Sequence, residues 1–185
     1  YVLFNPSDSK YYYEKILIDF RGESWFDFYG TSTTFIEFIG YPFVKFFAFS
    51  YEGVMALLSF FGFLGFIYFY VFFRENIRFK HTFFGYNLLT LIFFLPNLHF
   101  WSASFGKGAG IFFGFGLFFY GISSLRSRIV PVIVGSLIIY HVRPHIMLVV
   151  LVSSAIGFVF STRGISLTWR VIFVLFAAIG FFFIY

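Results

Sequence analysis

Residues 53–73 read GVMALLSFFGFLGFIYFYVFF, an apolar run without a charged side chain. A run of this length is what an α-helix needs to cross the hydrocarbon core of a bilayer, at about 1.5 Å per residue. The bilayer core holds no water, so the backbone groups must bond to one another within the segment. The run therefore predicts a transmembrane helix, and it decides the fold class.

The composition of the whole chain extends this prediction. Of 185 residues, 60% are hydrophobic and 11% are charged, whereas soluble domains carry about 25% charged residues. The apolar runs are continuous and do not alternate with polar residues as the strands of a membrane barrel do. We therefore expect an all-α fold, a polytopic transmembrane helical bundle. The chain starts at Tyr1 and stops inside an apolar run at Tyr185, so we expect a bundle incomplete at both ends.

Several further apolar runs follow the first one. They predict spans at about residues 82–101, 108–125, 129–142 and 144–160, and one more that begins near Val171. Residues 34–50 are too short to cross, since Glu37, Pro42 and Lys45 interrupt them. They predict an interfacial or re-entrant helix with its charges on the wet side. The chain thus divides into a loop, residues 1–52, and a transmembrane domain, residues 53–185.

Charge placement orients the chain. Basic residues outnumber acids in the turns at 74–81, 126–128 and 161–170, which hold Arg74, Arg78, Lys80, Arg126, Arg128, Arg163, Arg170 and the single acid Glu75. Turns rich in Lys and Arg stay in the cytoplasm. Residues 1–52 and the loops at 102–107 and 141–145 are then extracytoplasmic. The net charge of +5 therefore indicates membrane topology, and we expect no nucleic-acid partner.

Asp8 is the first candidate for chemistry, because it lies in the expected outer loop. A carboxylate there is suited to deprotonate a sugar hydroxyl, or to bind a divalent cation such as Mg²⁺ or Mn²⁺ that holds a diphosphate. The alternative is structural: Asp8 or Ser7 caps a helix that begins near Ser9. The chain contains no cysteine, which excludes a disulfide framework and a thiolate metal site.

His99 and Lys107 are the ionisable residues of the segment 97–107, NLHFWSASFGK. Lys107 opens the next apolar run between two glycines, and the free N–H groups of a helix start favour an anion. A phosphate would suit this place. The alternative is that Lys107 extends to lipid headgroups while His99 bonds a neighbouring carbonyl group. The sequence leaves both open.

The segment His141–His145, HVRPH, places three potential cations within five residues. Ionisable groups at membrane depth are costly and point to function. Arg143 is suited to hold a phosphate through two parallel hydrogen bonds, and His145 lies beside it. The two histidines suggest zinc less well, because Pro144 disfavours a regular helix through both and no third histidine is near. We therefore assign no metal ligands.

Taken together, these segments resemble those of bacterial polytopic glycan-assembly proteins. These are the O-antigen or exopolysaccharide polymerases and the GT-C-type glycosyltransferases, which use polyprenyl-linked sugars. The resemblance spans roughly residues 8–160 and rests on short motifs: an Asp followed by Tyr in the first outer loop, the helix end at 96–107, and the later Arg-Pro-His.

This resemblance implies a GT-C-like fold and roles for individual residues. Asp8 would be the base or a metal ligand, residues 34–50 would shape the lipid-sugar site, and Arg143 would hold the lipid diphosphate with help from Lys107. The acidic pair often present in GT-C-type sites is Asp8-Ser9 in this chain, which puts metal dependence in doubt.

Two classes of function follow. The first is an enzyme of the bacterial inner membrane that transfers or polymerises glycosyl groups from polyprenyl-(di)phosphate carriers, with Asp8 as base and His99 in a positioning or acid/base role. Arg143, Lys107 and His145 would bind the diphosphate. Membrane lipids and other glycan-assembly proteins would be its partners. The alternative is a non-catalytic membrane subunit or a transporter, in which the outer polar residues make structural contacts.

Overall fold

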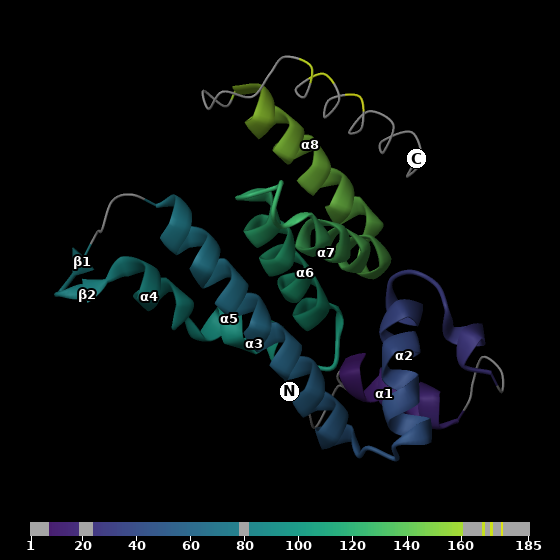
Figure 1. Ribbon diagram of the computed structural model, residues 1–185. Coiled ribbons are helices and arrows are strands. Elements are labelled where there is room, and N and C mark those ends of the chain that lie inside the picture. The colour runs from purple at the N-terminus through teal and green to yellow at the C-terminus, as the bar shows by residue number, and fades with distance from the viewer. Residues whose placement is uncertain are drawn as a thin grey trace. The chain divides into compact units, whose positions relative to one another are not determined.

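The computed structural model describes residues 8–18, 24–77 and 82–160, together with Thr168, Val171 and Leu175 (Figure 1). The described chain is mostly helical, which agrees with the expected all-α class. It forms two compact units, Tyr1–Val142 and Arg143–Tyr185. Several parts of the sequence prediction lie outside the described residues. These are residues 1–7, most of the expected last span, and the basic residues Arg78, Lys80, Arg163 and Arg170.

The first unit contains most of the helices. In chain order its elements are α1 (Asp8–Leu17), a 3-10 helix (Trp25–Phe28), α2 (Thr33–Tyr41), a π-helical turn (Pro42–Phe46), α3 (Tyr51–Asn76), the two-residue strands β1 (Thr82–Phe83) and β2 (Tyr86–Asn87), α4 (Leu88–Phe93), α5 (Pro96–Ser102), α6 (Lys107–Ile122) and α7 (Ile129–Val142). The strands pair antiparallel, with Thr82 opposite Asn87.

Helix α3 contains the apolar run that opened the sequence analysis. Its N-cap is Ser50, whose Oγ accepts a hydrogen bond from the Gly53 backbone N–H at 3.3 Å. Val54, Leu58 and Phe66 recur at helical spacing on its buried side. Among the described residues, α3 is the one continuous helix that is long and apolar enough to cross a membrane. Helices α5 and α6, bent by 106° at their junction, would together pass the same test.

The expected second span at 82–101 was wrong as a single helix. Phe84 and Gly85 have φ angles of 48° and 80°, which turn the chain into the β1–β2 hairpin. Asn87 then caps α4, and Leu95 is extended ahead of Pro96. Proline removes a backbone donor and disfavours helix in the residue before it, so α4 and α5 stay separate.

Three helices pack closely because glycines line their contacts. A Cβ added to Gly116 of α6 would lie 2.7 Å from the Gly65 carbonyl oxygen of α3. One added to Gly135 of α7 would lie 2.6 Å from the Gly114 carbonyl oxygen of α6. Gly121 meets Val132 further along the same pair of helices. Helix α6 therefore lies between α3 and α7 at backbone contact, as small residues permit in membrane helices.

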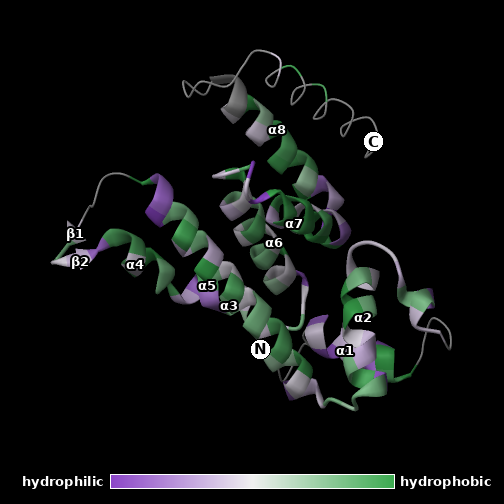
Figure 2. Cartoon of the chain, in the orientation of Figure 1, coloured by the Kyte–Doolittle hydropathy of each residue, from purple (hydrophilic) through white to green (hydrophobic). Residues whose placement is uncertain are grey.

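The contacts also give the directions of the helices. Phe66 of α3 packs on Phe112 of α6, and Phe72 packs on Phe119, so α3 and α6 run parallel. Gly110 meets Val142 and Gly121 meets Val132, so α7 runs antiparallel to α6. The returning chain lies along α3, with Phe93 against Phe73. Figure 2 shows the hydrophobic colour along much of α7 and the hydrophilic colour at the end of α3.

Within the first unit, the loops lie at the two ends of the bundle. They form the two groups into which the charge pattern divided them. At one end, Phe105 is fully buried against Gly40 of α2 and Tyr12 of α1, and the Ser32 backbone N–H bonds the His141 carbonyl oxygen at 2.7 Å. At the other end, Glu75 pairs with Arg128. The expected outer segments therefore share one end, and the two described basic turns share the other.

The expectation that residues 34–50 keep their charges on a wet side was wrong for Glu37. Its side chain is fully buried, and its Oε1 lies 3.9 Å from the Lys15 Nζ of α1. Lys45 is also engaged, since its Nζ donates to the Leu17 carbonyl oxygen at 3.0 Å. The helical prediction itself is confirmed, but α2 packs on α1 through a buried ion pair and not with polar atoms toward water.

The second unit is described by helix α8 (Pro144–Phe160). Its start is capped by Arg143, whose carbonyl oxygen accepts the backbone N–H groups of Ile146 at 3.0 Å and Met147 at 3.3 Å. Proline suits this first helical position, where an N–H would have no partner within the helix. The sequence prediction of helix in this segment is confirmed.

Candidate functional site

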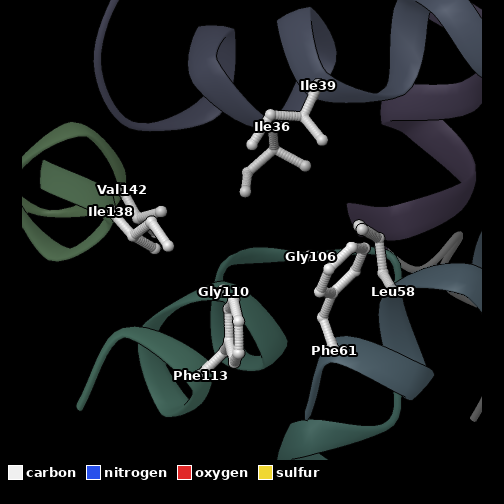
Figure 3. A pocket seen from close by; sticks show the side chains of 9 residues that line it. All are labelled: Ile36, Ile39, Leu58, Phe61, Gly106, Gly110, Phe113, Ile138 and Val142. Atoms are coloured by element: carbon white, nitrogen blue, oxygen red, sulfur yellow. The ribbon is translucent and has the colours of Figure 1, made fainter. Parts of the chain in front are cut away.

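An apolar cavity of about 140 Å³ lies where α2, α3, α6 and α7 meet (Figure 3). Each helix contributes aliphatic or aromatic side chains, or bare backbone at glycine: Ile36 and Ile39 from α2, Leu58 and Phe61 from α3, Gly110 and Phe113 from α6 with its cap Gly106, and Ile138 and Val142 from α7. A lining of this kind attracts hydrocarbon and offers water no hydrogen bonds. The cavity can therefore hold part of a lipid chain.

Glycines at four-residue spacing open this cavity. Gly110 and Gly114 share a face of α6, since residues four apart share a helix face. Gly106 is the extended N-cap residue four positions before Gly110, and of these three glycines Gly106 and Gly110 line the cavity while Gly114 packs on α7. A Cβ at Gly110 would lie 3.3 Å from the Val142 side chain, so any side chain there would reduce the space. This Gly-x-x-x-Gly-x-x-x-Gly spacing is visible in the sequence, and it is the signal by which sequence reasoning could have found the cavity.

Lys107 adjoins the cavity through its neighbour Gly106. It is the first residue of α6, and its side chain is half-buried. Gly106 precedes it in fully extended conformation, with φ −172°. The predicted place of Lys107 at a helix start, next to glycines, is therefore confirmed. Its ammonium group adds a positive charge to the partial positive charge of the helix start.

Asp8 begins α1 and is exposed. It is the first helical residue. A carboxylate at this position stabilises the helix through its interaction with the helix dipole, so Asp8 has a structural role at the helix start in place of the expected cap. Tyr12 follows one turn later on the same face and meets Phe105 edge-on, with ring centroids 6.2 Å apart. Ser9 accepts a hydrogen bond from the Tyr51 hydroxyl at 3.2 Å. These contacts bring the start of α1 to the end of the bundle where α3 and α6 begin.

His99 lies elsewhere in the bundle. Its ring stacks on Phe66 at 4.5 Å, and its Nε2 lies 2.7 Å from the Phe93 carbonyl oxygen. At 1.5 Å per residue, Phe66 lies about 22 Å along α3 from Tyr51, whereas Ser9 touches Tyr51 itself. The structure therefore does not bring His99 to Asp8. The contact of His99 with the Phe93 carbonyl oxygen matches the structural alternative from the sequence, in which His99 bonds a neighbouring carbonyl group.

Arg143 and His145 belong to the second unit. Both side chains are exposed, and the Arg143 backbone caps α8 as described above. Their neighbour His141 belongs to the first unit and is held there. Its Nε2 lies 3.2 Å from the Tyr29 hydroxyl, its Nδ1 lies 2.8 Å from the Leu137 carbonyl oxygen, and its ring stacks on Phe35 at 4.8 Å. His141 therefore anchors the segment that contains Tyr29 and Phe35 on α7, a role that the sequence did not reveal.

The described residues do not bring three His, Asp or Glu side chains together as a metal site of protein ligands requires. Asp8 alone does not make such a site, since Mg²⁺ and Mn²⁺ take several oxygen ligands. Among the described residues, Asp8 therefore has no further carboxylate or histidine ligands with which to hold a divalent cation.

The described part of the chain is mostly helical, contains one continuous helix long and apolar enough to cross a membrane, and has an apolar cavity toward the end where that helix begins. Comparisons of the chain with protein-family models, with curated proteins and with solved structures returned no match.

Proposed function

We propose that the chain is part of a multi-pass bacterial inner-membrane enzyme that transfers or polymerises glycosyl groups from polyprenyl-(di)phosphate carriers. The reaction takes place at the outer face, and other glycan-assembly proteins are its partners. The observation that carries the proposal is the apolar cavity next to Lys107. A lipid-linked sugar needs a hydrocarbon-binding surface beside a cation, and these two features adjoin one another at the start of α6.

In this proposal Asp8 accepts the proton of the acceptor hydroxyl group. The acceptor oxygen forms a bond to the anomeric carbon of the donor sugar, and the bond from that carbon to the phosphate oxygen breaks. The electron pair of the broken bond stays on the phosphate. Lys107 stabilises the additional negative charge that develops there, because a fixed cation favours the transition state over the less negatively charged ground state.

The other candidate residues take supporting parts. His99 is a positioning residue: its contacts with Phe66 and Phe93 hold α5 against α3 and so fix the loop that leads to Lys107. Arg143 and His145 belong to the second unit, and their part as diphosphate ligands stays a prediction. Their role rests on the resemblance and on their exposure.

The experiment compares Asp8→Asn and Lys107→Ala with matched variants of exposed residues on α1, Glu14→Gln and Lys10→Ala. Each variant is expressed at the normal level in cells that lack the native protein, and surface glycan is measured. We expect the first two to lose most glycan and the controls to retain it. Accumulation of single lipid-linked repeat units would identify a polymerase. Unchanged glycan in both test variants would exclude the enzyme.

One observation favours the alternative, a transporter or non-catalytic subunit. A transporter places ionisable groups within its spans, and His99 lies about 22 Å along α3 from its start. His99→Phe separates the two functions. As an enzyme with His99 in a positioning role, the protein would keep reduced activity with unchanged pH dependence. If the protein is a transporter that moves protons through His99, vesicles that contain the variant would lose substrate uptake driven by a proton gradient.

A further inference from the structure

Three phenylalanine rings project from the segment that precedes α3. Phe26 is 70% exposed, Phe46 65% and Phe47 64%. We call these three side chains the aromatic edge. Contiguous exposed apolar surface of this kind marks a site that contacts a membrane or another protein.

The aromatic edge is held by ring contacts behind it. Trp25 stacks on Phe38 at 5.0 Å, and its ring also meets Phe26 at 5.6 Å and Phe46 at 6.3 Å. Phe43 stacks on Phe47 at 6.0 Å. The three exposed rings therefore rest on a fixed aromatic base, so their exposure is a property of the folded loop.

Polar groups near the aromatic edge bond to backbone groups of the loop. The Trp25 indole N–H donates to the Phe38 carbonyl oxygen at 2.8 Å, and the Lys45 ammonium donates to the Leu17 carbonyl oxygen at 3.0 Å. The carboxylate of Asp27 is exposed beside Phe26 and accepts the Ser24 backbone N–H at 3.1 Å within the capping box of the 3-10 helix. These polar groups therefore have partners within the loop, and the three phenylalanine rings are the large apolar part of the surface.

The chain itself gives the position of this surface. Ser50, the N-cap of α3, follows Phe47 by three positions. Even a fully extended chain spans at most about 3.6 Å per residue, so Phe47 lies within about 11 Å of the point where α3 begins. Membrane-bound segments bury phenylalanine, tryptophan and leucine side chains at this level, where the acyl chains meet the headgroups.

We propose that the aromatic edge inserts into the bilayer that α3 crosses, at the boundary between headgroups and acyl chains of the leaflet where α3 starts. This inference rests on α3 as a membrane-spanning helix and does not depend on glycosyl transfer. It differs from the interfacial or re-entrant helix expected at 34–50 with its charges on the wet side, since Glu37 is buried. Its consequence is that the loop has a membrane contact separate from its contacts with α7.

The natural absence of cysteine allows a direct test. Spin labels are attached to Phe26→Cys, Phe46→Cys and Phe47→Cys in the full chain, reconstituted in vesicles of phosphatidylcholine and phosphatidylglycerol. Collisions of each label are measured with oxygen, which concentrates in the bilayer, and with a water-soluble nickel complex. Lys10→Cys is the matched control, on an exposed side chain that pairs with Glu14 at 3.8 Å.

Insertion predicts that oxygen collisions exceed nickel collisions several-fold at residues 26, 46 and 47, with the reverse at residue 10. Nickel collisions in excess at all three aromatic positions would place the edge in water. Low collision rates with both reagents would mean that protein covers it. Either result would overturn the proposal. Three independent labels keep the test decisive if one variant fails to fold, and measured surface glycan reports separately on the proposed enzyme.

Discussion

The guanidinium group of Arg128 donates a hydrogen bond from each of its two terminal nitrogens to the carboxylate of Glu75. Nη1 lies 2.6 Å from Oε2 and Nη2 lies 2.9 Å from Oε1. Arg128 also donates to the Ser123 hydroxyl at 3.1 Å and lies over the Tyr120 ring at 4.1 Å. One side chain thus joins the end of α3 to the turn between α6 and α7. The forked geometry is one that lysine cannot provide.

The first prediction concerns this ion pair. Arg128→Lys and Glu75→Gln should each lower the melting temperature of the detergent-solubilised protein, and the double variant should lose less than the sum of the two. The control is Glu14→Gln, which breaks the exposed Lys10–Glu14 pair on α1 and should change the melting temperature little. Additive losses in the double variant would show that the two residues act independently.

The same pair predicts a dependence on pH. Glu75 lies beyond the apolar run 53–73, and hydrogen bonds from Arg128 hold its pKa below the ordinary value of 4.5. A lowered pKa in the folded state stabilises the protein above the ordinary pKa, and the contribution is lost as the pH falls through the lowered value. The melting-temperature difference between wild type and Glu75→Gln should therefore be constant near neutral pH and disappear in acid. A difference that grows in acid would contradict the assignment.

Backbone contact between α6 and α7 predicts a steric effect at Gly135. A Cβ there would lie 2.6 Å from the Gly114 carbonyl oxygen and 2.7 Å from the Phe118 nitrogen. Gly135→Ala should destabilise the protein by about 1–3 kcal/mol, as overpacking does. Gly157→Ala on α8 is the control, since no described heavy atom lies within 4 Å of its added Cβ. It should be neutral or stabilise by up to about 1 kcal/mol. Equal chemical-denaturation midpoints for the two variants would rule out the close packing.

The buried ion pair between α1 and α2 predicts a strong coupling. Lys15→Met removes the counter-charge from the fully buried Glu37, and loss of one partner from a buried pair costs about 3–5 kcal/mol. The double variant Lys15→Met with Glu37→Leu should recover most of this loss, because it removes the remaining buried charge as well. Urea titration of both variants measures the coupling. A double variant as unstable as Lys15→Met would show that the loss does not come from the charge.

The sequence predicted the helices that have clear boundaries. The expected run 129–142 is α7, and the helix after it ends at Phe160 as expected. Arg126, Ser127 and Arg128 separate α7 from α6, and Pro144 begins α8, so charge and proline mark these boundaries directly. The ends of α3 were within a few residues for the same reason, since Ser50 caps its start and Arg74 follows the apolar run.

Two sequence predictions were wrong, the single span at 82–101 and the exposure of Glu37. Each has a physical cause that amino-acid composition does not reveal. Residues 82–101 are apolar enough for one span, but hydropathy averages over the turn at Phe84 and Gly85 and the break at Pro96. Glu37 was expected to face water because most glutamates do, and its burial depends on Lys15, which lies on a different helix. Tertiary pairing of this kind is not visible in the local pattern.

The candidate site was predicted in part for the same reasons. Lys107 begins a helix next to glycines, a local feature that short motifs reveal. The separation of His99 from Asp8 depends on where α5 lies along α3, and the apolar cavity depends on four helices at once. The contacts of the His141 ring with Tyr29 and Phe35 join residues far apart in the sequence, so the local pattern did not reveal them.

The return of the chain along α3 in two short pieces has a consequence for biosynthesis. Helices α4 and α5 are each too short to cross alone, and lipid cannot satisfy the free backbone groups at the Leu95–Pro96 break. This segment therefore needs α3 already in place as a surface to pack on. Helix α6 must then follow before Phe105 can be buried and hold the loop between α5 and α6. Because α3 precedes α4 and α5 in the chain, it is synthesised first and is available as that surface.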